Sequence, residues 1–312
     1  MWPLRTIISN QLYVKPELQK RPISMMRPHF MTSKKHGNLH IAPFKHLEIK
    51  LGNPDDIYDV SEYENIIYRS LRNEDNRLKN FWFNQEKITI RHRNILIDRF
   101  CEHHFNAQLM TTTFYRFIGI FDRFLSTTHV DVNDFEIYAF ASLFIASKLE
   151  EMQPLSTNDL LMMSGNLFLP EALYMAEEKV ANSIKFDFMF PLPIEYLNNF
   201  IRVSGQDINS HFTSRYILEV IQTHEAFYGM KGSLMAAVAI LVTRYLMNEE
   251  QKWTKELEGY TGYAKMDLIH FARVIHSALL EDERLEINII KQKYVSELYH
   301  KVANCQIPAR FE

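Results

Sequence analysis

The chain has 312 residues, of which 46% are hydrophobic and 23% charged, so it can bury a large core and does not have the composition of a disordered protein. Glycine accounts for only 9 residues, which argues against sandwiches, barrels and glycine-loop nucleotide enzymes, because strand-rich folds need many tight turns. The formal charge is −3, but residues 1–50 hold nine Lys and Arg against two acids (+7), so the remainder carries −10 and lacks the basic surface expected of a DNA-binding domain.

The predicted elements begin after a proline-rich segment. Residues 1–54 contain six of the eleven prolines and no sustained periodicity, which predicts a flexible basic tail. The first helix is expected near Tyr58, where apolar residues recur at helical spacing: Val60, Tyr63, Ile66, Ile67 and Leu71. A second helix carries Ile95, Leu96 and Phe100 on one side. A third runs from Thr111 to Leu125, with Thr111 or Thr112 expected as its cap.

Two segments are apolar on every side and predict central helices. The first is Phe135 to Leu149, and a helix without a polar face should be surrounded by other helices. Pro170 then suits the first turn of a further helix that runs to about Ile184. Pro191 and Pro193 mark a domain boundary. Beyond it, Ser233–Ile240 repeats the small, apolar composition 91 residues after Ser142, which predicts two helical bundles in tandem.

Composition also bears on the cellular setting. Two cysteines, Cys101 and Cys305, cannot form a disulfide framework, so a reducing nuclear or cytosolic compartment is expected. The longest apolar run, Leu234 to Val242, is far shorter than the ~20 residues that span a bilayer. We therefore expect an intracellular protein without a membrane or nucleic-acid partner.

Several strings, in consistent order and spacing over roughly residues 58–303, resemble the cyclin family. Phe144–Glu151 resembles the central helix of the cyclin box, and Lys185–Phe188 followed by Pro191–Pro193 resembles the exit from the first box in B-type (mitotic) cyclins. The remaining strings are Arg93–Asp98, Asp122–Ser126, Trp253–Thr254, Tyr260–Tyr263 and Lys291–Tyr294. The resemblance implies an all-α fold of two tandem five-helix cyclin boxes. An N-terminal helix and the first box occupy residues 55–190, the second box occupies residues 191–305, and the flexible basic tail over residues 1–54 precedes them.

The resemblance also implies a function. Cyclins are regulatory subunits that bind and activate a cyclin-dependent Ser/Thr protein kinase, here of the mitotic type, and so control cell-cycle progression. Such a subunit has no catalytic residue and no cofactor of its own. It pushes the kinase αC helix inward, so that the glutamate of that helix pairs with the phosphate-positioning lysine. Protein substrates and a nuclear and cytoplasmic location follow from the same resemblance.

Lys148 and Glu177 match the pair with which cyclins hold the kinase. Lys148 ends an apolar helix, and Glu177 lies between Leu173 and Ala181 on the rim of an apolar stripe, where a charge can bind partner backbone in a partly desolvated setting. Ordinary solvated helix ends are the alternative. Other positions that match kinase-facing residues are Leu149, Glu150, Glu151, Phe186, Asp187 and Phe188.

Two further cyclin features are altered in this sequence. The substrate-docking patch has the form Met-Arg-x-Ile-Leu-x-x-Trp, but His92 and Arg99 stand at the Met and Trp positions, and of the patch only Arg93, Ile95, Leu96 and the downstream Glu102 remain. A phosphate pocket of B-type cyclins is matched by His211 and Arg215, whereas Phe190 stands where its arginine is expected. Arg93 and Asp122 match a structural pair that ties the first box helix to the second.

Other classes of function fit less well. A metal or nucleophile site would have to use Cys101-Glu102-His103-His104, where adjacent histidines point to different helix faces and no second ligand cluster has metal spacing. A kinase-independent cyclin-fold scaffold is the main alternative. A transcription-factor-IIB-like module would bring a zinc ribbon and a basic face, and the sequence has neither.

Overall fold

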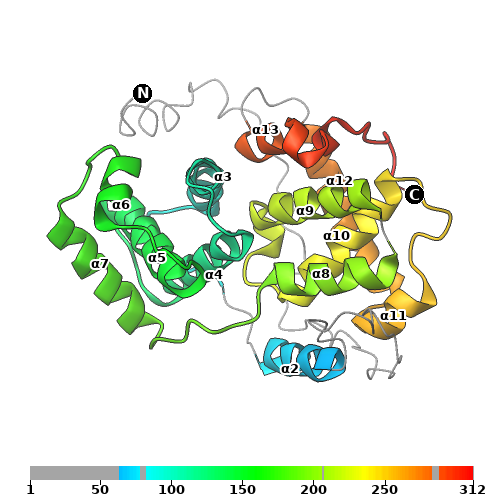
Figure 1. The fold of residues 1–312 in the computed structure, drawn as a ribbon, viewed down its shortest axis with the longest axis horizontal. Coiled ribbons are helices and arrows are strands. Elements are labelled where there is room, and N and C mark those ends of the chain that lie inside the picture. The colour runs from blue at the N-terminus through cyan, green and yellow to red at the C-terminus, as the bar shows by residue number, and fades with distance from the viewer. Residues whose placement is uncertain (1–62, 78–81, 206, 283–287, 312) are drawn as a thin grey trace.

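The computed structural model describes residues 63–77, 82–205, 207–282 and 288–311, and every regular element within these ranges is a helix (Figure 1). The predicted tail over residues 1–54, and the start of the first helix at Tyr58 and Val60, lie outside them. None of the described helices is long and apolar enough to cross a bilayer.

The first bundle consists of five helices, with α5 at its centre. They are α3 (Ile90–Asn106), α4 (Thr111–Thr127), α5 (Phe135–Glu150), α6 (Thr157–Met163) and α7 (Pro170–Ser183). α5 packs against α4 and α7, and its side chains from Tyr138 to Ser147 are buried on all sides. Ala139, Ala141 and Ala146 are 0% exposed, since small side chains let the neighbouring helices approach closely. The predicted central helix is confirmed.

The second bundle repeats this plan. It contains α8 (Pro193–Ser204), α9 (Ile208–Gln222), α10 (Gly232–Leu246), α11 (Lys255–Thr261) and α12 (Lys265–Asp282), followed by the short α13 (Ile289–Val295). α10 is the second central helix: α8, α9 and α12 pack around it, and it is buried from Ser233 to Arg244. Figure 1 shows the two bundles side by side, joined by the chain between α7 and α8. Two tandem five-helix bundles are therefore confirmed.

The predicted caps of α4 are wrong. Its N-cap is Met110, which makes no side-chain cap bond. Instead, the Glu151 carboxylate at the end of α5 accepts hydrogen bonds from the Met110 amide (2.7 Å) and the Thr113 hydroxyl (2.5 Å). A carboxylate suits this position because the amide groups of a first helical turn have no intrahelical acceptor and carry partial positive charge.

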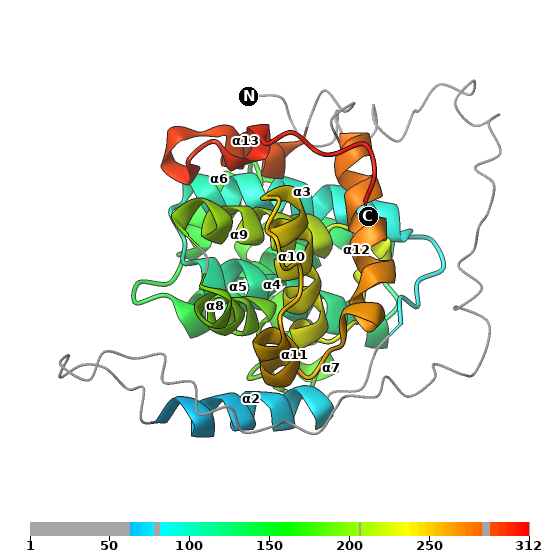
Figure 2. The ribbon, with the colours of Figure 1, turned by 90° about the vertical axis from the view of Figure 1, so that its right-hand side faces the viewer.

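The N-terminal helix α2 (Glu64–Arg77) lies along the second bundle (Figure 2). Its Tyr68 ring stacks on Tyr260 at 4.3 Å between centroids, and the Tyr68 hydroxyl donates to the Tyr260 carbonyl at 2.9 Å. The predicted apolar stripe is not the buried one: Tyr63, Ile66 and Ile67 are 53%, 64% and 47% exposed. The buried residues of this helix are Glu64, Tyr68, Arg72 and Asp75, and Leu71 of the predicted stripe is half-buried.

His103 on α3 is a half-buried imidazole whose titration opposes folding in acid. Its ring lies 5.5 Å from Phe100 and 5.7 Å from Phe140 between centroids. Burial, helped by nearby Arg99, lowers the pKa of His103 to about 4. The unfolded chain binds this proton near pH 6.5 and the folded chain does not, so stability present at pH 7 is lost as the pH falls toward 4.

We therefore expect His103 to reduce the free energy of unfolding by about 2 kcal/mol between pH 7 and pH 5. Urea unfolding of the parent and of His103→Leu at both pH values measures this effect as a difference in pH slope. The comparison with the variant removes the contribution of the other titrating groups. Equal slopes for the two proteins contradict the expectation.

Candidate partner-binding surface

The two residues that match the kinase-holding pair meet on the surface of the first bundle. Lys148 lies in the last turn of α5 and Glu177 in the middle of α7, and the Lys148 Nζ is 2.5 Å from the Glu177 Oε1. Their side chains are 42% and 22% exposed, and the Lys148 ammonium also lies 3.7 Å from the centroid of the Phe144 ring. The pair is thus held on one side by the protein and open to a partner on the other.

Large apolar side chains are exposed on the same segments. At the end of α5, Leu149 is 41% and Met152 99% exposed, and on α7 Tyr174 and Met175 are 50% and 71% exposed. After α7, Phe186 and Met189 are 65% and 75% exposed. Single exposed apolar residues are ordinary, but several on adjoining segments are candidates for an interaction site. We call the set Lys148, Leu149, Met152, Tyr174, Met175, Glu177, Phe186 and Met189 the pair surface.

Arg116 on α4 connects the end of α5 to the chain that follows α7. Its guanidinium donates to Glu150 at 2.7 Å and to the carbonyls of Phe188 and Phe190 at 2.8 and 2.7 Å. Arg116 is 5% exposed, so these are buried contacts that are stronger than surface ones. Glu150 and Glu151, both matched to kinase-facing positions, therefore have internal partners, and their contact with a kinase stays a prediction.

The chain after α7 turns sharply to present Phe186. Lys185 and Phe186 both have left-handed backbone, with φ of 56° and 58°. The Phe186 amide donates to the Ala181 carbonyl at 2.9 Å, which closes α7 in the manner of a Schellman motif. Phe188 packs edge-to-face on Phe186, with centroids 5.8 Å apart. The exposed Asp187 carboxylate lies 3.1 Å from Arg123 on α4, which anchors the turn.

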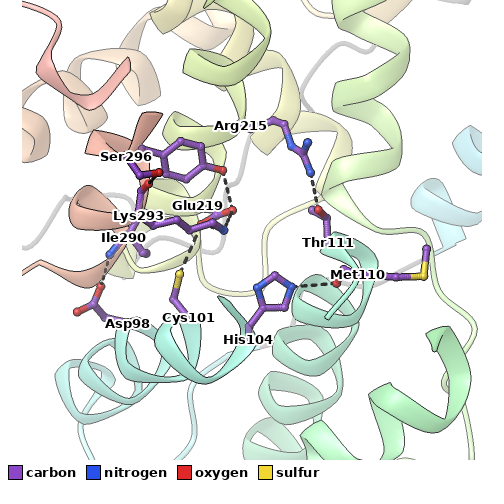
Figure 3. Close-up of polar contacts among 11 residues, drawn as sticks. Asp98, Cys101, His104, Met110, Thr111, Arg215, Glu219, Ile290, Lys293 and Ser296 are labelled. Atoms are coloured by element: carbon purple, nitrogen blue, oxygen red, sulfur yellow. Dashed lines mark hydrogen bonds and ion pairs between the residues drawn. The ribbon is translucent and has the colours of Figure 1, made fainter. Parts of the chain in front are cut away.

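A buried polar cluster joins α9 to α13 and reaches the first bundle through Cys101 (Figure 3). The Glu219 carboxylate on α9 is 1% exposed and accepts from the Lys293 ammonium at 2.7 and 2.9 Å and from the Tyr294 hydroxyl at 2.8 Å. The Cys101 thiol of the first bundle donates to Glu219 at 3.7 Å. Burial, followed by the Glu219 charge, raises the pKa of Cys101 well above its usual value. Burial alone lowers the pKa of Lys293, but Glu219 outweighs it and that pKa is raised.

Two more contacts from α3 reach the second bundle. The Asp98 carboxylate accepts from the Ile289 and Ile290 amides at 3.3 and 3.1 Å, at the first turn of α13. Arg93 makes the expected pair with Asp122, with bonds of 2.8 and 2.5 Å, and also donates to the Gln222 carbonyl at the end of α9. Sequence reasoning identified the Arg93–Asp122 pair but not its reach into the second bundle. It missed the Glu219 cluster, whose one signal was the string that contains Lys293 and Tyr294.

Comparison with known proteins identifies the family. Residues 64–189 match the model of the cyclin N-terminal domain, and residues 191–308 match that of the cyclin C-terminal domain. The G2/mitotic-specific cyclin-B3 of Caenorhabditis elegans is 30% identical over 275 residues, covering 85% of this chain and 71% of the relative. The chain is a B-type cyclin.

Other relatives agree. The G2/mitotic-specific cyclin-B of Spisula solidissima is 27% identical over 78% of this cyclin and 57% of its own length, so the chain spans a little over half of that relative. Among solved structures, a viral cyclin from herpesvirus saimiri shares the fold with a TM-score of 0.61 at 18% identity, covering 67% of this chain and 94% of the viral one. A chain of the yeast RNA polymerase II CTD kinase complex CTDK-1 also shares it, with a TM-score of 0.54 at 10% identity over 78% of this chain and 84% of that one.

The residues matched to the substrate-docking patch expose little apolar surface. Leu96 is 6% exposed and belongs to the core, which leaves Ile95, at 39%, as its exposed aliphatic residue. The His92 ring belongs to a capping box with Thr89, whose amide donates to the His92 Nδ1 at 3.1 Å. Burial, with Arg91 nearby, lowers the pKa of His92. Arg99 is half-buried and Glu102 is exposed.

This cyclin should therefore bind Arg-x-Leu peptides poorly, because a leucine anchor needs an apolar floor that Arg99 does not provide. We expect the double variant His92→Met, Arg99→Trp to bind such peptides at least about tenfold more tightly, a change of 1.4 kcal/mol. Fluorescence anisotropy with a labelled peptide measures both proteins, and a Leu→Ala peptide is the control. Low-micromolar binding by the parent contradicts the prediction.

The residues matched to the phosphate pocket have partners within the chain. Arg215 on α9 donates to the Thr111 hydroxyl at the start of α4 (Figure 3). Burial, followed by the Arg215 charge, lowers the pKa of the half-buried His211. Phe190 is 7% exposed, and the Arg116 and Arg123 guanidinium carbons lie 5.0 and 3.9 Å from its ring centroid. Phosphate binding by His211 and Arg215 stays a prediction.

Proposed function

We propose that this cyclin is the regulatory subunit of a mitotic-type cyclin-dependent Ser/Thr kinase and that it binds the kinase through the pair surface. One observation carries the proposal: an accessible ion pair, Lys148–Glu177, lies among exposed apolar side chains on α5, α7 and the following turn. Mitotic cyclins among the relatives support the choice of kinase class. We further propose that the chain supplies no catalytic group and acts in the nucleus and cytoplasm.

The chemistry of the pair surface suits a kinase helix and its neighbourhood. The Lys148 ammonium has three donors and the Glu177 carboxylate has acceptor sites beyond the one used internally, so each can bind partner backbone. Met152, at 99% exposure, and Phe186, at 65%, supply apolar area whose burial stabilises the complex. Because the subunit binds one conformation of the kinase better than the other, it shifts the kinase toward the active state.

Activation in a purified system tests this function. The chain is mixed with an inactive monomeric mitotic cyclin-dependent kinase, and phosphorylation of a Ser/Thr-Pro peptide is followed together with binding. We expect a complex of 1:1 stoichiometry and a large rise in activity. If the chain binds no kinase of this family, the regulatory function is wrong, and a kinase-independent scaffold becomes the better account of the fold.

A transcription-factor-IIB-like role has less support. Within the part of the chain that the structure describes, no group of three or more His, Cys, Asp or Glu side chains could hold a metal ion. The surface charge argues in the same direction, because residues outside 1–50 carry a balance of −10.

A further inference from the structure

Gly119 lies in the middle of α4, where a glycine needs a local reason because it destabilises a helix relative to alanine. The reason is the Phe190 ring, which lies directly against it. A Cβ atom at Gly119 would be 2.6 Å from the Phe190 Cζ and closer still to Cε2, a distance at which one of the two must move. Phe190 itself stands where the family resemblance leads us to expect an arginine. The two residues therefore fit each other.

The Phe190 ring is enclosed by two arginines of α4. The guanidinium carbons of Arg123 and Arg116 lie 3.9 and 5.0 Å from the ring centroid, within the range of a cation–π contact. Phe190 is 7% exposed, and its backbone is restricted because Pro191 follows it and disfavours helical dihedral angles at the preceding residue. The ring is therefore held at one place on α4.

The same two arginines hold the turn formed by residues 185–188, which presents its apolar side chains to solvent. Arg116 donates to the Phe188 carbonyl at 2.8 Å. Arg123 pairs with the Asp187 carboxylate at 3.1 Å. Each arginine thus contacts both the ring and the turn. A shift of the ring moves both guanidinium groups, and with them the donors that fix the turn.

We propose that Gly119 is a positioning residue for kinase binding: it admits the Phe190 ring, and the ring sets the two arginines that hold Phe186 in place. The proposal rests on the proposed function, since Phe186 belongs to the pair surface. A turn that is fixed in advance binds more tightly, because the complex then loses less entropy in ordering it.

Gly119→Ala adds one methyl group and displaces the ring. The cleft beside it, about 310 Å³ in volume and lined by both Gly119 and Phe190, can receive the ring, so we expect the variant to fold. In the free chain, the Phe186 amide donates to the Ala181 carbonyl at 2.9 Å. We expect its hydrogen exchange, followed by mass spectrometry, to become about tenfold faster or more. With the kinase, we expect the Kd to rise at least about tenfold, equivalent to 1.4 kcal/mol.

A second substitution makes the test specific for the ring. A leucine side chain ends at its Cδ atoms, and the Phe190 Cδ2 lies 3.5 Å from the same Cβ position, which is an ordinary van der Waals contact. The double variant Gly119→Ala, Phe190→Leu should therefore bind the kinase more tightly than Gly119→Ala alone, and its Phe186 amide should exchange more slowly. A merely structural role for Gly119 predicts the opposite, because the effects of two independent core changes add.

Ala239→Val is the matched control. It adds methyl groups to a residue of α10 that is 0% exposed, so it crowds the core of the second bundle without adding atoms beside the Phe190 ring. Thermal unfolding compares the stability of the parent and all three variants. The control should bind the kinase like the parent, because it leaves the turn in place.

Four results overturn the proposal. They are unchanged exchange at Phe186 in Gly119→Ala, unchanged kinase affinity in that variant, binding that the double variant does not restore, and equal loss of binding by Ala239→Val. If the parent chain binds no kinase, the proposed function fails instead, and the exchange measurement still decides whether Gly119 sets the turn.

Discussion

Exchanging the charges of the pair surface should abolish kinase activation without unfolding the protein. In Lys148→Glu, Glu177→Lys the internal ion pair can form again with its partners reversed, because the parent atoms lie 2.5 Å apart on two packed helices. Each side chain then offers a partner the wrong charge: a carboxylate faces backbone carbonyls, and an ammonium faces amides. Like charges and unmatched polar groups at an interface cost several kcal/mol, so we expect activation to fall by about 100-fold or more.

The measurement is the kinase assay of the proposed function, run beside urea unfolding. The stability of the exchanged variant should stay within about 1 kcal/mol of the parent, since partly exposed pairs contribute little. The matched control exchanges another surface pair, Lys87→Glu, Asp131→Lys, whose atoms are 2.7 Å apart and whose side chains are 67% and 63% exposed. Full activation by the exchanged Lys148–Glu177 variant contradicts the assignment of the pair surface. Loss of activation by the control as well would mean that the exchange experiment does not locate the kinase interface.

The largest change in stability should come from Lys293→Met. This substitution leaves the Glu219 carboxylate 1% exposed with only the Tyr294 hydroxyl and the Cys101 thiol as donors. Breaking a buried ion pair from one side destabilises proteins by about 3–5 kcal/mol, because the remaining charge has lost its compensation. We expect a decrease of this size in the free energy of unfolding, measured in urea.

The double variant Glu219→Gln, Lys293→Met should recover most of that loss, because both charges are then gone. Lys301→Met is the control: it removes a pair with Glu297 whose side chains are 52% and 85% exposed, and it should change stability by less than about 0.5 kcal/mol. If Lys293→Met costs no more than Lys301→Met, the buried ion pair does not stabilise the fold in this way.

Features that depend on a few neighbouring residues could be predicted from the sequence, whereas features that depend on contacts between distant segments could not. Both central helices, α5 and α10, were predicted because an apolar helix of small residues requires neighbours on every side wherever it lies in the fold. The apolar stripe of α2 is largely exposed, and the face that is buried is mostly polar, with Arg72 and Asp75 beside Tyr68. The face with Tyr68 is buried since Tyr260, 192 residues away, offers it a stacking ring and a carbonyl.

The residues of the pair surface also divide into those that a sequence motif identified and those that only the structure identified. Lys148 and Glu177 were found through family motifs, whereas Met152 and Met189 have no motif and were found by their exposure. The internal roles of Glu150 and Glu151 depend on Arg116, Met110 and Thr113, which lie 34 to 41 residues earlier in the chain. Nothing in the local pattern of two adjacent glutamates distinguishes a helix cap from a partner contact.

The sequence by itself determined the all-helical class and the two bundles, because helical periodicity acts over a few residues. The tertiary structure alone decided which charges meet: Glu219 with Lys293 across 74 residues, and Arg116 with Glu150. The physical reason is that an ion pair depends on a separation of a few ångströms and on exclusion of water, and packing sets both between segments that are distant in the chain.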